Sequence, residues 1–167
     1  MADRFMSLQN LKFTLNSRRS RYPDLAGDIL NGCADQTIDM VFKSVQEVGN
    51  KIMHPIFEEM DRKPPTLEKG VVKVHPAVRS MLKTLGKDGW IAASFPEAWG
   101  GEEMPVSILH CINFIFAAAN YSAAVYPGLT KGAANLLFSF GSAELQKTFL
   151  PPMPAGKWQG TMVPADV

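Results

Sequence analysis

The residues of this chain that are able to do acid–base, nucleophilic or metal chemistry are few and scattered. Histidines and cysteines supply much of such chemistry, as proton carriers, nucleophiles and metal ligands. The chain has three histidines and two cysteines, which are His54, His75, His110, Cys33 and Cys111. Their spacing matches no metal-binding or redox motif. His54 and His75 each precede a proline where a helix is expected to end or start, and His110 lies in an apolar segment where one polar contact would satisfy it. We therefore predict no metal site here.

Two pairs of adjacent glutamates offer the only other acid–base candidates, Glu58-Glu59 and Glu102-Glu103. Neighbouring side chains point apart on a helix and in a loop, so neither pair is arranged to pass a proton to one substrate. Both pairs are better explained as solvated faces. We accordingly nominate no catalytic residue.

Gly100-Gly101 follows Trp99 and is a candidate for phosphate binding. No strand precedes this dipeptide, and no third glycine follows at the spacing of a nucleotide-binding loop. We interpret it instead as a tight turn that needs a positive φ, with Trp99 covering apolar surface.

Composition narrows the class of protein. The chain has 167 residues, 46% of them hydrophobic, and its 17 basic and 16 acidic side chains leave a net charge of +1. This is enough for one well-packed domain and gives no electrostatic case for nucleic acid. The basic residues at 18–21 either touch phosphate or form a solvated loop, and we favour the loop.

Localisation follows from what the sequence lacks. Two cysteines make no disulfide framework, and the N-terminus has no secretory pattern, so we expect a cytoplasmic protein with reduced thiols. The most apolar segment, at 106–119, contains polar residues and is shorter than the ~20 residues of a membrane span. We expect no membrane span.

Apolar periodicity predicts an all-α fold, a helical bundle. Apolar residues recur at three- and four-residue steps over 35–52, 76–85, 105–120 and 129–140, with a short helix at 142–149. Asp35 is the expected N-cap of the first helix, and Pro55 bends or ends it. The segment 105–120 is apolar nearly all round, which is typical of a buried helix. Gly141 ends the helix at 129–140, and Ser142 caps the next one.

Three segments fall outside this helical pattern. The first 27 residues lack a sustained period and are expected to form a short extended or single-turn segment that packs on the body. Residues 61–75 are charged and proline-rich and predict a loop with a brief extended stretch. Residues 159–163 could open a β-strand, but a lone strand cannot satisfy its edges. The C-terminus therefore looks cut where a further domain would start.

Three motifs stand in order within this frame. They are Pro-Glu-Ala-Trp-Gly-Gly at 96–101, Gly-Ser-Ala-Glu-Leu-Gln-Lys at 141–147, and Gly-Lys-Trp-Gln-Gly-Thr-Met at 156–162. Their order and helix-length separation resemble the N-terminal part of flavin-dependent acyl-CoA dehydrogenases, over residues 35–162 and more loosely before Gly89. The third motif looks most like the larger branch of that family, which includes the methylmercaptopropionyl-CoA and long-chain-like types.

The resemblance implies an organisation of the chain. Residues 1–34 would be an N-terminal extension that packs on the body, and residues 35–157 would form the family's N-terminal helical domain. Residues 158–167 would be the truncated start of a β-domain that is missing.

The resemblance also implies an activity for full-length members. They oxidise an acyl-CoA thioester to the trans-2-enoyl-CoA: a glutamate removes the α-proton, and the β-hydride passes to N5 of FAD. That glutamate lies in the family's C-terminal helical domain, which has no counterpart here, so we expect the chain alone to be inactive. The implied partners are an acyl-CoA substrate, an electron-transfer flavoprotein or similar acceptor, and further copies of the chain in a homo-oligomer.

Two regions are implied as binding sites. Leu129 and Gly132 would line an apolar slot for the acyl tail, although ordinary helix packing explains them equally well. Thr161, Met162 and Val163 correspond to the strand whose backbone passes the flavin ring. The family then continues with Leu-Thr-Glu-Pro, and the threonine that meets the flavin has no counterpart here. We therefore expect weak FAD binding at best.

A second hypothesis is that the chain has the helical fold of the family but no catalytic activity. The chain would be a stand-alone helical module, catalytically dead, that pairs through an exposed apolar face and forms oligomers. An assay with acyl-CoA and an artificial electron acceptor separates the two hypotheses for any longer product.

Overall fold

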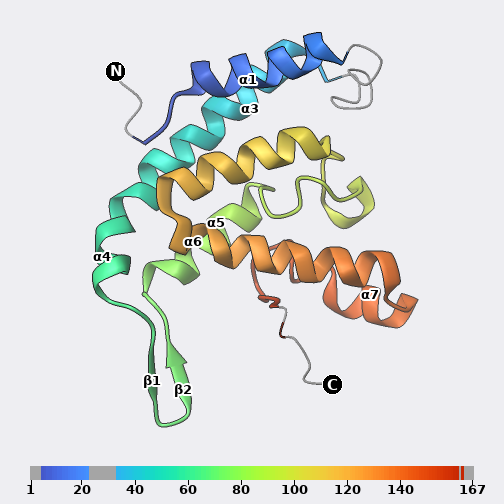
Figure 1. The fold of residues 1–167 in the computed structure, drawn as a ribbon. Helices are drawn as coiled ribbons and strands as arrows, with labels where there is room; N and C mark the ends of the chain where they lie inside the picture. The colour runs from blue at the N-terminus through green and yellow to red at the C-terminus, as the bar shows by residue number, and fades with distance from the viewer. Residues whose placement is uncertain (1–4, 23–32, 162, 164–167) are drawn as a thin grey trace.

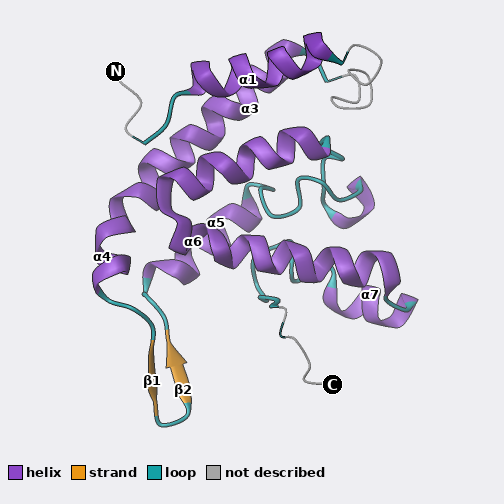
Figure 2. Cartoon of the chain, viewed as in Figure 1, coloured by secondary structure: helices purple, strands orange, loops and turns teal. Residues whose placement is uncertain are grey.

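The structure is a computed structural model that describes residues 5–22, 33–161 and 163. Over these residues the regular secondary structure is helical apart from one short hairpin, which confirms the all-α prediction (Figures 1 and 2). The helices are α1 (Leu8–Arg21), α3 (Asp35–Val48), α4 (Phe57–Arg62), α5 (Ala77–Lys87), α6 (Val106–Phe140) and α7 (Ala143–Phe149). The hairpin consists of β1 (Thr66–Glu68) and β2 (Val71–Lys73), which pair antiparallel and are fully exposed.

The N-terminal segment forms a full helix, so the prediction of a short extended or single-turn piece was wrong. Helix α1 has 14 residues, and the Ser7 side chain caps it by accepting a hydrogen bond from the Asn10 amide at 3.3 Å. Leu8, Leu11 and Leu15 pack against the core at helical spacing. The basic residues at 18–21 lie in the last turn of α1, where cations complement the free carbonyls, and not in a loop.

Helix α3 ends at Val48, and the helical path continues beyond it with a bend, which is one of the two outcomes predicted for the proline at 55. A π-helical turn (Gly49–Met53) and a 3-10 turn (His54–Ile56) connect it to α4, so the proline at 55 redirects the helical path without ending it. The predicted N-cap is wrong by one position: Asp35 is the first helical residue, Ala34 precedes it without a side-chain bond, and Asp35 pairs with Arg19 at 2.6 Å.

Helix α6 joins two predicted helices through a bend. Its hydrogen bonding runs from Val106 to Phe140, but Asn120 has extended backbone angles (φ −167°, ψ 99°), so α6 consists of two segments. The first segment is not buried all round as predicted. Ile112 and Ile115 are fully buried, whereas Val106 and Phe114 are 63% and 55% exposed. The helix therefore has one face toward the core and one toward the outside.

The core forms around the two segments of α6. Helix α6 packs against α3, α4, α5 and α7. The larger cluster joins α3, α5 and the first segment, with fully buried Phe42, Val45, Leu85 and Ile112 among its members. A smaller cluster lies under α7 and contains Phe95, Ala134, Leu150 and Met153. As predicted, the apolar residues of α5 face inward and are buried: Val78, Met81, Leu82 and Leu85.

The predicted turn and cap near the smaller cluster are confirmed. Gly100 has φ +77°, and Trp99 packs against this cluster. The Ser142 hydroxyl accepts a hydrogen bond from the Leu145 amide at 3.4 Å and so caps α7. The predicted strand after Trp158 is absent from the described residues 159–161 and 163. A strand there would need a partner strand, and the segment instead lies against α6, where the Gly160 amide donates to Thr130 Oγ1 at 3.4 Å.

Helix α6 is long and apolar enough to cross a bilayer by length and composition alone. It has 35 residues, which is longer than the predicted apolar segment, so length does not exclude a span. The core helix of a soluble domain has the same properties. The bend at Asn120 and the packing against α3, α4, α5 and α7 favour that second explanation.

Candidate ligand pocket at the bend of α6

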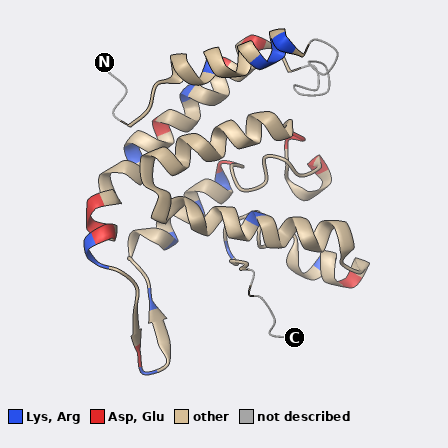
Figure 3. Ribbon diagram, viewed as in Figure 1, with Lys and Arg blue, Asp and Glu red and all other residues tan. Residues whose placement is uncertain are grey.

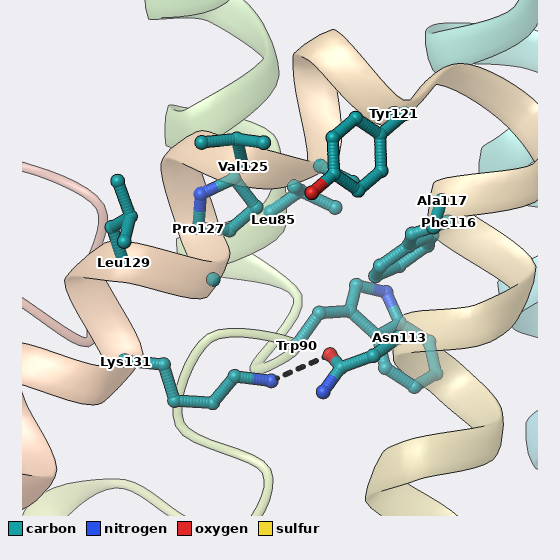
Figure 4. A pocket seen from close by; sticks show the side chains of 12 residues that line it. Leu85, Trp90, Asn113, Phe116, Ala117, Tyr121, Val125, Pro127, Leu129 and Lys131 are labelled. Atoms are coloured by element: carbon teal, nitrogen blue, oxygen red, sulfur yellow. Dashed lines mark hydrogen bonds between the residues drawn. The ribbon is translucent and has the colours of Figure 1, made fainter.

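A cavity of about 310 Å³ lies between the two segments of α6 and the end of α5. A cavity of this size is at the lower end of the range for small-molecule sites. Figure 4 shows the side chains around it. The first segment of α6 supplies Asn113, Phe116 and Ala117, and the second supplies Tyr121, Ala124, Val125, Pro127, Gly128, Leu129 and Lys131, while Leu85 and Trp90 come from α5 and the loop after it.

The bend that opens the pocket is held by one buried polar side chain. Asn120 is 1% exposed, and its Nδ2 donates to the backbone carbonyl of Met53 at 3.1 Å. Its Oδ1 accepts from the Ala123 amide at 3.0 Å, which is the geometry of an N-cap for the second segment. Asn120 thus starts the second segment and ties it to the bend between α3 and α4.

The walls of the pocket are mostly apolar. The rings of Trp90 and Phe116 meet edge to face, with centroids 6.4 Å apart and planes at 88°. Leu85 is fully buried at the end of α5, and Leu129 lies across the cavity on the second segment of α6 (Figure 4). An apolar group placed between these walls would lose part of its contact with water.

One charged side chain enters this apolar space. Lys131 Nζ donates to Asn113 Oδ1 at 2.9 Å, a bond that spans the bend between the two segments (Figure 4). Burial among apolar groups lowers the pKa of Lys131 from 10.5 to about 8. No carboxylate lines the cavity, and Tyr121 is the only other titratable side chain among the lining residues.

Lys131 is the one charged side chain in helix α6. Among the 35 residues of α6, Lys131 is the only Lys, Arg, Asp or Glu. Figure 3 shows the same contrast: the ribbon is coloured for charged residues at several places on α1, α3 and α4 and is almost free of them along α6. A single amine on an otherwise uncharged helix, placed at a cavity, is a candidate for contact with a ligand.

The predicted binding residues lie in different surroundings. Leu129 lines the pocket, whereas Gly132 is partly buried on α6 and is not a lining residue. Thr161 and Val163 are exposed, and Met162 lies outside the described residues. Gly160, just before Thr161, lies against the same helix segment that carries Leu129, because its amide donates to Thr130.

Sequence reasoning missed the polar members of the pocket, Asn113 and Lys131. The available signal was the single charge within the apolar run from 106 to 140. The spacing of 18 residues between Asn113 and Lys131 gives no local motif, because only the bend brings the two side chains together.

The histidines occupy ordinary structural positions. His75 Nδ1 accepts a hydrogen bond from the Ala77 amide at 3.2 Å at the start of α5, and its Nε2 lies 3.5 Å from Glu59 Oε2. His110 was predicted within a buried helix but is exposed on α6. In the described ranges, no three His, Cys, Asp or Glu side chains gather as metal ligands would.

Comparison with known proteins places this fold in a family. The model of the acyl-CoA dehydrogenase N-terminal domain matches residues 35–157. The chain is 25% identical over 146 residues to 3-methylmercaptopropionyl-CoA dehydrogenase of Ruegeria pomeroyi, covering 86% of this chain and 24% of that protein. It is 26% identical over 135 residues to the broad-specificity linear acyl-CoA dehydrogenase FadE5 of Mycobacterium tuberculosis, covering 78% of this chain and 22% of that protein.

A solved structure supports the fold independently. A chain in a structure of the electron transferring flavoprotein of Acidaminococcus fermentans, from work on flavin-based electron bifurcation, aligns with a TM-score of 0.61. The alignment has 18% sequence identity and covers 75% of this chain and 30% of that one. The chain spans about a quarter of the length of the curated relatives it matches. The family match covers most of the chain, which therefore belongs to the acyl-CoA dehydrogenase family through that family's N-terminal helical domain.

Proposed function

We propose that this chain is the N-terminal helical part of an FAD-dependent acyl-CoA dehydrogenase. Such an enzyme removes a proton from the α-carbon and a hydride from the β-carbon of an acyl-CoA thioester, and gives the 2-enoyl-CoA. The observation that carries the proposal is the family match over residues 35–157. Two relatives named as acyl-CoA dehydrogenases support the same reaction class.

The contribution of this chain is to hold the acyl group. The pocket at the bend of α6 offers an apolar channel bounded by Trp90, Phe116 and Leu129, of the kind that buries an alkyl chain. Burial of the acyl group removes water from the reacting carbons, which strengthens every electrostatic interaction with them. The role of Leu129 in this proposal is that of an apolar wall.

The described residues do not form a site for FAD by themselves. Thr161 is exposed, the described residues beside it are not in a strand, and no glycine-rich phosphate loop accompanies them. Because the chain spans 24% and 22% of its two relatives, we propose that the flavin site and the catalytic base belong to polypeptide that this chain does not cover.

The proposal includes the location of the enzyme in the cell and its electron acceptor. We propose a cytoplasmic location, with electrons passing from the flavin to an electron-transfer flavoprotein or a similar acceptor. The likeness to a chain in a structure of such a flavoprotein is in the fold alone and does not identify the acceptor.

The first test is the size of the native product, by immunoblot of source cells with an antibody against this domain. We expect a band several times heavier than 18.4 kDa. That product should reduce an artificial electron acceptor when acyl-CoA is added, while the purified 167-residue chain should show no turnover. Turnover by the short chain would contradict the assignment of the chemistry to other polypeptide.

A second candidate rests on exposed apolar side chains at the end of the molecule formed by α6 and α7. Phe140 is 83% exposed, and Leu136, one turn earlier on the same face, is 54% exposed. A native band at 18.4 kDa would favour a stand-alone module that pairs through this surface, without catalysis. Light scattering of the purified chain would then report an oligomer.

A further inference from the structure

The amine of Lys131 is held in an apolar pocket without a counter-charge. Within the described residues, its recorded hydrogen bond is to the neutral side-chain oxygen of Asn113, at 2.9 Å. An ammonium group has three donors, so this bond leaves donor capacity facing the cavity. Taking a cation out of water is costly unless an anion or several acceptors replace the lost hydration.

The rest of the cavity is suited to a hydrocarbon. Trp90, Phe116 and Leu129 provide its walls, and no lining residue carries a negative charge. Figure 4 shows the amine of Lys131 pointing across the cavity toward Asn113 and the indole of Trp90. A ligand that complements this arrangement has an apolar body and an acceptor group at one end.

We propose that the pocket at the bend of α6 binds an aliphatic carboxylate, with its alkyl chain between Trp90, Phe116 and Leu129 and its carboxylate at Lys131 Nζ. The inference rests in part on the proposed function: in an acyl-CoA dehydrogenase, this carboxylate would be the far end of the acyl group. It names a substrate class for that site, acyl groups that carry a terminal anion.

Charge favours a carboxylate over a neutral acceptor. A bond between an ammonium and a carboxylate is about twice as strong as one between neutral groups, and the low polarity of the surrounding side chains strengthens it further. Neutral acceptors such as an amide would fit the same space but would leave the lysine charge uncompensated. Preference for the anion over a neutral analogue of the same shape is therefore the property to measure.

Isothermal titration calorimetry of the full 167-residue chain provides the test, with octanoate and the isosteric neutral octanamide as probes. We expect octanoate to bind at least about tenfold more tightly than octanamide. Lys131→Met keeps the apolar stem and should abolish this preference, whereas Lys131→Arg should retain it. Lys147→Met is the matched control, because Lys147 is exposed on α7 and is not a lining residue of the pocket.

Three outcomes would overturn the inference: no binding of octanoate, equal affinity for octanamide, or an unchanged preference in Lys131→Met. Circular dichroism of each variant shows whether it has folded. The result is independent of the dehydrogenase assignment, because it needs neither flavin nor turnover. If the native product shows no acyl-CoA dehydrogenation, the proposed function fails but the preference for octanoate is unaffected. If the chain does not prefer octanoate, the carboxylate inference fails, and the proposed dehydrogenation of a neutral acyl group is unaffected.

Discussion

At the scale of single residues, Lys131 should make the stability of the fold depend on pH. Its pKa is about 8 in the folded chain against an ordinary 10.5, because burial disfavours the charged form. Between these values the unfolded chain holds a proton that the folded chain has released, so the free energy of unfolding rises with pH across this window. Below pH 8 both states are protonated, and the cost of burying the charge is fully present, on the order of 3 kcal/mol.

The measurement compares urea unfolding of the natural chain and Lys131→Met from pH 7 to pH 9.5. We expect the methionine variant to be more stable at pH 7, since it buries no charge, and the difference to narrow as pH rises. Other titrating groups are common to both chains and cancel in the difference. A stability difference that stays constant with pH would show that the lysine amine is solvated.

Asn120 is the residue on which the bend depends. Replacement by alanine would leave the buried Met53 carbonyl and the Ala123 amide without their partners. Each orphaned group costs about 1–3 kcal/mol, so we expect Asn120→Ala to lose ~3 kcal/mol of unfolding free energy. Asn135→Ala is the control, because Asn135 is exposed on the same helix. Thermal or urea unfolding of both variants checks this, and equal stability would mean that the bend is held by packing alone.

At the scale of elements, two glycines let helix α5 touch the segment after α7. A Cβ on Gly86 would lie 2.3 Å from the backbone of Ala155, and one on Gly156 would lie 2.2 Å from the Leu82 carbonyl oxygen. Gly156 also has φ +68°, a conformation that L-residues with side chains rarely adopt. Both the backbone angle and the close approach require glycine at 156.

Comparison of Gly156 with Gly70 in the hairpin separates the effect of the positive φ from the effect of the close approach. Gly70, next to β2, has a similar φ of +77°, but a Cβ there would meet no atom within 4 Å. We expect Gly70→Ala to cost ~1 kcal/mol, from the backbone angle alone. Gly156→Ala should cost ~3 kcal/mol or more, because the segment must also move away from α5. Chemical denaturation of the two variants measures the difference. Similar losses would mean that the segment shifts freely.

The same elements show how far the sequence predicts this fold. Periodicity located α5 and α7 and the buried face of α5, because each is a local pattern of apolar residues with a stop signal. It failed for α1, where apolar positions on the outer face, such as Phe13, hide the helical period. It also failed to join the two segments of α6, because the bend is set by the long-range bond from Asn120 to Met53.

Of the residues that line the candidate pocket, only Leu129 was predicted from the sequence as a binding residue, through the family resemblance. Leu129 came from a resemblance in helix position, and it does line the pocket. Asn113 and Lys131 meet across the bend, so no window of neighbouring residues contains their pairing. A pocket that depends on a bend in one helix is visible only in three dimensions.

At the scale of the whole molecule, exposed apolar side chains occur on several elements, and two of the most exposed aromatic rings are Phe140 at the end of α6 and Phe13 on α1. Phe140, the last residue of α6, lies one helical turn after Leu136 on the same face, and both side chains are exposed. Figure 1 shows the end of the molecule with α7 apart from α1, the helix that contains Phe13. A clustered apolar surface in water favours association, whereas a single exposed ring does not.

We therefore predict that the purified chain self-associates through the α6–α7 end as its concentration rises. Phe140 and Phe13 are 83% and 73% exposed, so they form a matched pair that differs in its surroundings. Phe140→Ser should shift the weight-average mass in sedimentation equilibrium toward the monomer value of 18.4 kDa, because it removes the most exposed ring of the cluster. Phe13→Ser should leave the mass unchanged. Equal effects of the two substitutions, or a chain that stays monomeric throughout, would contradict association through the surface that contains Phe140.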